Sequence, residues 1–158
     1  MSDSTPTSVP IYNDRLTGEN FPDATSMVNA YLKRFGEAAA ISPDGQASLD
    51  ETGYAQLQRG SATIGVNVLE AQGVLMVFAP IMTVSASNRE AFYRKLLELS
   101  FVTTSDAAFA INALRDEVVV RCLRRLSALD YEEFEDIITT VGDVADRWDE
   151  VLVEEFLR

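Results

Sequence analysis

The sequence contains no histidine and only one cysteine, Cys122. Without histidine, Ser-His-Asp and Cys-His catalytic arrangements and zinc sites of the Cys2His2 type are excluded. A single cysteine excludes an internal disulfide, and its place in an apolar segment favours a small buried side chain over a nucleophile. No GxGxxG or GKS/T string is present, so nothing supports a phosphate-binding loop. These absences favour binding over catalysis, and we expect no enzymatic activity and no cofactor.

Basic residues are also few, since 13 Lys and Arg face 25 Asp and Glu for a net charge of -12. Such a chain repels phosphate backbones and anionic lipid surfaces, which predicts no nucleic acid partner and no membrane partner. No apolar run approaches the roughly 18 residues of a membrane helix. The Met1-Ser2-Asp3 start lacks the basic and apolar regions of a signal peptide, so we expect a cytoplasmic protein. Basic or apolar protein partners remain possible.

The chain has 158 residues, of which 47% are hydrophobic, and this fits one domain. Residues 1–20 show neither a helical nor a strand period, and we predict a flexible N-terminal arm there. In an alternative interpretation the arm docks on a neighbouring surface through Val9, Ile11 and Tyr12. The folded domain is predicted to span residues 21–158.

Apolar spacing within this domain predicts an α+β fold with the order helix, three strands, helix, two strands, helix. Each helix begins at a polar cap: Asp23, the Ser87 to Glu90 capping box, and Asp130. Gly36 is a natural end for the first helix. The five strands are expected at Tyr54–Gln58, Ile64–Val68, Val74–Val84, Ala107–Ala113 and Val118–Leu126, with Pro80 bending or ending the third.

One set of carboxylates has a spacing that suits a metal ion. Asp143, Asp146 and Glu150 lie three and four residues apart and share a face of the last helix. The other interpretation is a solvated acidic face, which we favour because no turn residues or amides complete a ligand shell. We therefore predict no metal site.

Arg121, Arg124 and Arg125 form the only basic cluster. In a strand, Arg121 and Arg125 share the face that carries Val119 and Leu123. Two interpretations stay open: the arginines pair with carboxylates of the chain itself, or this mixed face receives an extended peptide.

The amount of apolar surface also bears on function. Residues 74–84 and 107–113 are apolar on both strand faces, and three helices can leave one face uncovered. Monomers rarely expose apolar patches above a few hundred Å2, so an uncovered face, or the second side of the middle helix, would contact another chain. The alternative is that the helices cover both faces.

Three stretches carry a resemblance to a known family: Leu96-Leu97-Glu98-Leu99-Ser100-Phe101, the strand Ala107–Ile111, and Leu129-Asp130-Tyr131-Glu132-Glu133-Phe134 with Trp148 beyond it. With its size and acidity, the chain resembles the type III secretion chaperones of the Tir-chaperone class and the structurally similar YbjN family. The resemblance implies an antiparallel sheet with helices packed on it.

The resemblance further implies a non-catalytic homodimer that binds a segment of another protein along the first helix and the sheet. By position, the dimer candidates are Tyr93, Leu97 and Ser100, and the partner-surface candidates are Val28, Leu32, Phe35, Val119, Arg121 and Leu123. The function predicted first is a chaperone-like binding module for a client protein. The alternative is a YbjN-type regulator that binds a signalling protein of a two-component system.

Overall fold

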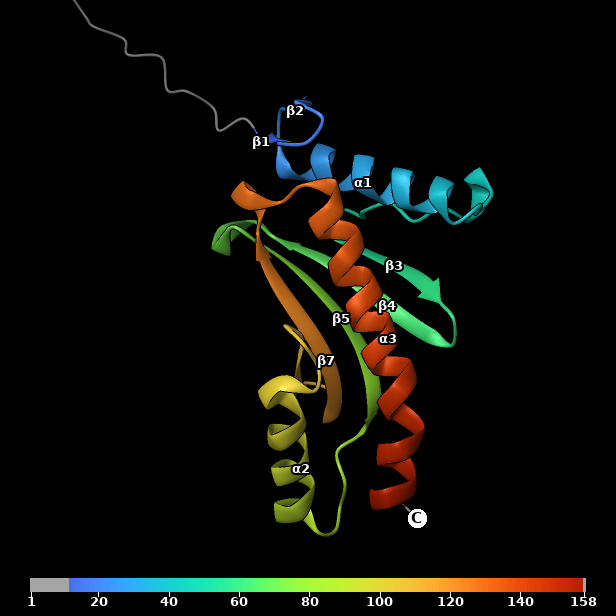
Figure 1. Cartoon of the computed structure of the whole chain (residues 1–158), viewed down its shortest axis with the longest axis vertical. Coiled ribbons are helices and arrows are strands. Elements are labelled where there is room, and N and C mark those ends of the chain that lie inside the picture. The colour runs from blue at the N-terminus through green and yellow to red at the C-terminus, as the bar shows by residue number, and fades with distance from the viewer. Residues whose placement is uncertain (1–11, 158) are drawn as a thin grey trace, which may run out of the picture.

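The structure, a computed structural model, describes residues 12–157 and confirms the predicted α+β order. An antiparallel sheet of five strands runs in the order β3-β4-β5-β7-β6 (Figure 1). The strands are β3 (Tyr54–Arg59), β4 (Ala62–Leu69), β5 (Val74–Thr83), β6 (Ala108–Asn112) and β7 (Glu117–Arg125). The helices are α1 (Ala24–Ala38), α2 (Arg89–Val102) and α3 (Tyr131–Phe156). None of these helices is long and apolar enough to cross a membrane.

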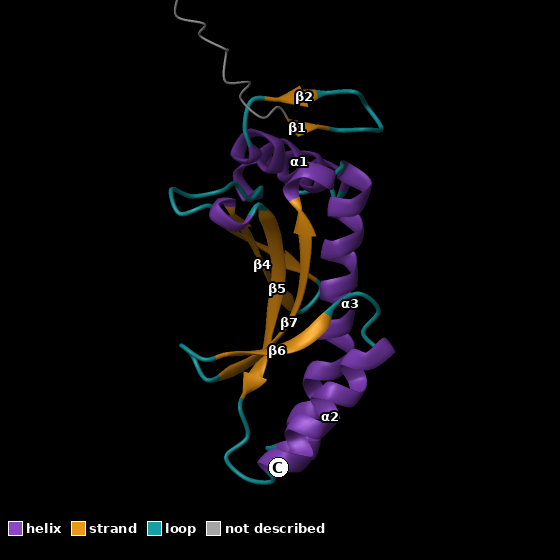
Figure 2. Ribbon diagram, turned by 90° about the vertical axis from the view of Figure 1, so that its left-hand side faces the viewer, coloured by secondary structure: helices purple, strands orange, loops and turns teal. Residues whose placement is uncertain are grey.

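Helices α1, α2 and α3 all lie on the same side of the sheet, and within residues 12–157 no α-helix lies on the other side (Figure 2). Helices α1 and α3 cover β4, β5 and β7, where alternate strand residues point toward them. The main core that results includes Val28, Leu32, Ile64, Val66, Leu75, Val77, Phe134, Ile137 and Ile138. Helix α3 packs on this core along one long apolar stripe, whose buried members include Phe134, Ile137, Ile138, Val141, Ala145 and Leu152.

Helix α2 closes a second, smaller core at the far end of the sheet. Its residues Phe92, Leu96 and Leu99 are buried there, and the Phe92 ring lies 5.0 Å from that of Phe156 near the end of α3. The register of β5 shifts between Pro80 and Met82, so the strand is irregular at Pro80 as predicted. The shift lets Met82 join this second core.

Two of the three predicted helix caps are confirmed, because the side chains of Asp23 and Asp130 accept backbone hydrogen bonds from Ser26 and Glu133. The predicted Ser87 cap is wrong. Helix α2 is preceded by Asn88, which has a positive φ of 51° and makes no side-chain capping bond. Helix α1 also continues past Gly36 to Ala38.

Part of the segment predicted as a flexible arm is folded instead. Strand β1 (Tyr12–Asn13) pairs with β2 (Asn20–Phe21) in a hairpin that sits beside α1 (Figure 1). Tyr12 packs against the main core, in agreement with the docked interpretation for that residue. Val9 and Ile11, the other residues expected to dock, lie outside the described residues. The boundary at residue 20 was therefore placed too late in the chain.

Candidate protein-binding surfaces

A groove of about 440 Å3 lies between α1, the loop that follows it and the edge strand β3. We call it the α1–β3 groove. Its lining is apolar or amide-bearing and carries no charge: Leu32, Phe35, Gly36, Ile41, Gly45, Ala47, Gln56, Leu57 and Gln58. Such a lining suits apolar side chains of another chain, together with polar backbone groups that reach the glutamines.

The loop wall of the groove is held in place by two side-chain amides. Asn29 of α1 accepts a hydrogen bond of 2.8 Å from the backbone N–H of Leu49, and Gln46 donates one of 3.1 Å to the backbone carbonyl of Ile41. The first bond joins the loop to α1, and the second joins two residues within the loop. The loop wall of the groove is therefore held by hydrogen bonds of the chain itself.

The outer edge of β3 is unpaired where it borders the groove. The carbonyl of Gly53 accepts from Val68 of β4, whereas both backbone groups of Tyr54 bond to Asp50 on the other side. Because successive residues of a strand point their backbone groups in opposite directions, those of Gln56 and Gln58 point away from β4. Within residues 12–157 they have no hydrogen-bond partner. A second strand could pair there.

The partner-surface candidates on α1 differ in accessibility. Val28 is fully buried in the main core, so its helical spacing reflects packing and its assignment to the partner surface is not supported by its position. Leu32 and Phe35 are also largely buried but line the groove. The groove residues Ile41 and Gln58 were missed, because a loop and an edge strand carry no periodic signal.

The exposed side of α2 carries an apolar stripe of Tyr93, Leu97 and Phe101, spaced four residues apart. Leu97 is 72% exposed and Phe101 is 89% exposed. Ser100 has another role, because its hydroxyl donates to the carbonyl of Leu96 and accepts a 3.0 Å bond from the N–H of Phe109. It joins α2 to the edge strand β6.

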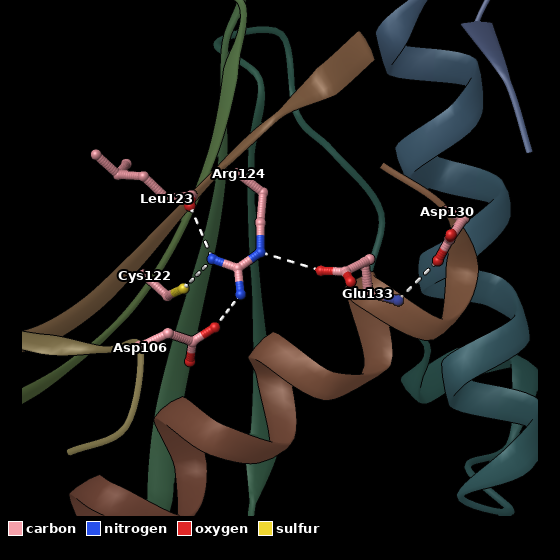
Figure 3. Close-up of polar contacts among 6 residues, drawn as sticks. All are labelled: Asp106, Cys122, Leu123, Arg124, Asp130 and Glu133. Carbon is pink, nitrogen blue, oxygen red and sulfur yellow. Dashed lines mark hydrogen bonds and ion pairs between the residues drawn. The ribbon is translucent and has the colours of Figure 1, made fainter. Parts of the chain in front are cut away.

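The arginine cluster divides between the two faces of β7. Arg124 points to the helix side, where it pairs with Asp106 and with Glu133 of α3 (Figure 3). It also donates to the sulfur of Cys122, 3.0 Å away. Burial raises the pKa of the Cys122 thiol, with a contribution from Asp106, although Arg124 acts in the opposite direction. This thiol is therefore a packed core group with little thiolate character.

Arg121 and Arg125 point to the helix-free side of the sheet together with Val119 and Leu123. Val119 is buried, whereas Leu123 is 41% exposed. Neither arginine forms an ion pair with the residues that the structure describes. The interpretation that the arginines pair with the chain's own carboxylates thus holds for Arg124 alone.

Two of the three carboxylates with metal-like spacing, Asp143 and Asp146, contact the β3–β4 turn. Asp143 forms a 3.3 Å ion pair with Arg59, and Asp146 accepts a short hydrogen bond from Ser61. Within residues 12–157 no group of three potential ligands is placed to hold a metal ion. Asp143 and Asp146 instead fasten the turn between β3 and β4 to α3.

Residues 31–149 match the sequence model of the Tir chaperone protein (CesT) family, from α1 to α3. The chain belongs to this family. Among curated proteins, no sequence matches it significantly.

Solved structures share the fold of this CesT-family chain. A chain of the ExsC–ExsE complex is 24% identical with a TM-score of 0.67, covering 82% of this chain and 96% of that one. A chain of the HopA1–SchA chaperone–effector complex is 8% identical with a TM-score of 0.62, covering 78% and 94%. A chain of the ExoU–SpcU heterodimer from the type III secretion system of Pseudomonas aeruginosa is 14% identical with a TM-score of 0.57, covering 77% and 93%.

Proposed function

We propose that this CesT-family chain is a non-catalytic chaperone that acts in the cytoplasm as a homodimer and binds a segment of another protein. The observation that carries the proposal is the position of the uncharged α1–β3 groove directly beside the unpaired edge of β3. The relatives support it, since one of the similar structures is a chaperone–effector complex.

Binding would combine two contributions at this edge. An extended client segment would pair with the outward backbone groups of Gln56 and Gln58, as in strand addition to an exposed sheet edge. Its apolar side chains would enter the groove against Phe35 and Ile41. Burial of apolar surface supplies affinity, and the net charge of -12 keeps the complex soluble.

The α2 stripe supports the homodimer. Leu97 and Phe101 expose large apolar side chains on one face of a helix, and a symmetric partner would bury the same residues from both copies. Helix α2 is attached to the sheet by its opposite face, so this contact needs no rearrangement of the core. It also leaves the α1–β3 groove open in each copy.

Affinity capture from the host with paired variants tests the client site. Gln58→Pro removes the outward N–H of β3, and Gln58→Val keeps that N–H as a matched control. Ile41→Asp places a charge in the groove. Its matched control is Leu114→Asp, which places the same charge in the β6–β7 turn, where Leu114 is 98% exposed.

We expect the wild type, Gln58→Val and Leu114→Asp to capture the same partner protein, and Gln58→Pro and Ile41→Asp to lose it. Far-ultraviolet circular dichroism and thermal unfolding check that each variant is folded. Equal capture by all folded variants would contradict the α1–β3 groove as the client site.

A further inference from the structure

The helix-free side of the sheet is a second continuous surface, which we call the open face. Alternate residues of all five strands point to it because strand side chains alternate between faces. One row, paired residue by residue, crosses the sheet from edge to edge: Gln56, Gly65, Phe78, Arg121 and Ala108. No helix of the described chain lies over this row (Figure 2).

The centre of the open face is an aromatic platform. The rings of Tyr54 and Phe78 lie 6.3 Å apart, and the Phe78 ring extends over Gly65. A Cβ atom at Gly65 would lie only 2.5 Å from that ring, so glycine is what allows it to lie against the strand. The next row adds Met76 and Leu123, and Leu123 is 41% exposed. The platform therefore spans four neighbouring strands, from β3 to β7.

The charge of the open face is opposite to that of the chain. Arg121 and Arg125 both lie on it and make no ion pair within residues 12–157, whereas Arg124 on the other face binds two carboxylates. Of the 25 Asp and Glu residues, only Glu117 occupies an open-face position in the five strands, about 13 Å along β7 from Arg121. Two cations without an ion pair in the described part of the chain thus border an apolar platform in a protein of net charge -12.

We propose that the open face binds a partner segment that carries apolar side chains next to Asp or Glu. Apolar side chains would pack on Tyr54 and Phe78, and carboxylates would form charge-assisted hydrogen bonds with Arg121 and Arg125. At physiological ionic strength charges are screened beyond about 8 Å, so these arginines outweigh the distant acidic surface of α3. This inference rests on the proposed protein-binding function, and it adds a second surface and the chemistry of the segment bound there.

Selection from a random 12-residue peptide display library tests the proposal with the full chain. The wild type should enrich peptides with apolar residues and more Asp and Glu than the unselected library. The double variant Arg121→Glu, Arg125→Glu should lose this preference and enrich Lys and Arg. The control Arg15→Glu, Arg115→Glu changes the net charge equally at exposed turn positions and should select as the wild type does.

One enriched acidic peptide is then measured by fluorescence anisotropy. Its dissociation constant should rise at least 10-fold in Arg121→Glu, Arg125→Glu and stay within twofold in the control and in the groove variant Ile41→Asp. An acidic peptide that is lost with Ile41→Asp but retained by the arginine variant would overturn this inference and leave the proposed function standing. Peptide binding at the open face, together with no client binding at the α1–β3 groove, would overturn the groove as the client site and leave this inference standing.

Two further results would overturn the proposal. One is enrichment of basic or uncharged peptides by the wild type. The other is an assembly larger than a dimer that dissociates in Arg121→Glu, Arg125→Glu, measured by light scattering, because a second copy of the chain would then occupy the open face.

Discussion

The carboxylate of Asp14 accepts a 2.9 Å hydrogen bond from the hydroxyl of Tyr31, which joins the N-terminal hairpin to α1. The same carboxylate accepts from the backbone N–H of Tyr131 at the start of α3, 117 residues away. Asp14 is 1% exposed, so its removal leaves buried donors without a partner. One side chain thus holds together the hairpin and the two helices that cover the sheet.

Asp14→Asn should therefore destabilise the fold. The asparagine amide nitrogen would replace one of the two carboxylate oxygens that now accept hydrogen bonds, so a buried donor would face another donor. We expect a loss of about 1–3 kcal/mol in the free energy of unfolding. Urea unfolding at pH 7 measures this loss. Asp44→Asn is the control, because Asp44 is exposed, and a loss as small as that of the control would contradict the role given to Asp14.

Acid unfolding should depend on the same residue. Burial acts to raise the pKa of Asp14, but hydrogen bonds from Thr17, Tyr31, Leu16 and Tyr131 outweigh it and hold the pKa below its ordinary value. A lowered pKa means that this stabilisation is complete above about pH 4 and is lost as the pH falls through the folded-state pKa. Between pH 5 and 2 the free energy of unfolding should fall more in the wild type than in Asp14→Asn. Parallel plots of this free energy against pH for the two proteins would contradict the role of the Asp14 carboxylate.

The turn before β3 requires glycine at position 53. Gly53 has a positive φ of 81°, and a Cβ atom there would lie 3.0 Å from the backbone carbonyl of Val68. Gly18 also has a positive φ, but nothing lies within 4 Å of its Cβ position. Gly18→Ala should cost about 1 kcal/mol from backbone strain alone.

Gly53→Ala should cost about 2–3 kcal/mol because the contact adds to that strain. Thermal and urea unfolding of the two variants give the comparison. Equal losses would show that the contact with Val68 is relieved by a small shift of the turn.

Leu97→Glu should dissociate the proposed homodimer. Leu97 is 72% exposed in the single chain, so a charge there leaves the monomer fold intact but cannot be buried between two copies. Light scattering coupled to size exclusion should report half the wild-type mass. Leu114→Glu, at a 98% exposed position in the β6–β7 turn, should keep the dimer. An unchanged mass for Leu97→Glu would place any dimer contact elsewhere.

The order of elements could be predicted because most of them have a local signal in the sequence. The apolar alternation of Ile64 to Val68 and the caps at Asp23 and Asp130 are properties of short segments, and the structure confirms all of them. The Ser87 cap was wrong, since Asn88 with its positive φ precedes the helix, while the carbonyl of Ser87 accepts a hydrogen bond from the hydroxyl of Ser85.

The parts that could not be predicted depend on contacts between distant residues. Asp14 lies in a polar segment without a periodic pattern, and its bonds to Tyr31 and Tyr131 join the hairpin formed there to α1 and α3. Helical spacing placed Val28 and Leu32 on one face, but it could not show that only Leu32 reaches a groove. A groove also needs its opposite wall, which here is an edge strand without a distinctive pattern.

Amide hydrogen exchange at the outer edge of β3 tests the central claim most directly, once affinity capture has supplied a client protein. The N–H groups of Gln56 and Gln58 should exchange rapidly in the free protein and become protected when the client is bound, because they would then donate to its backbone. A client that binds with protection elsewhere, while both amides exchange as in the free protein, would contradict strand addition beside the α1–β3 groove.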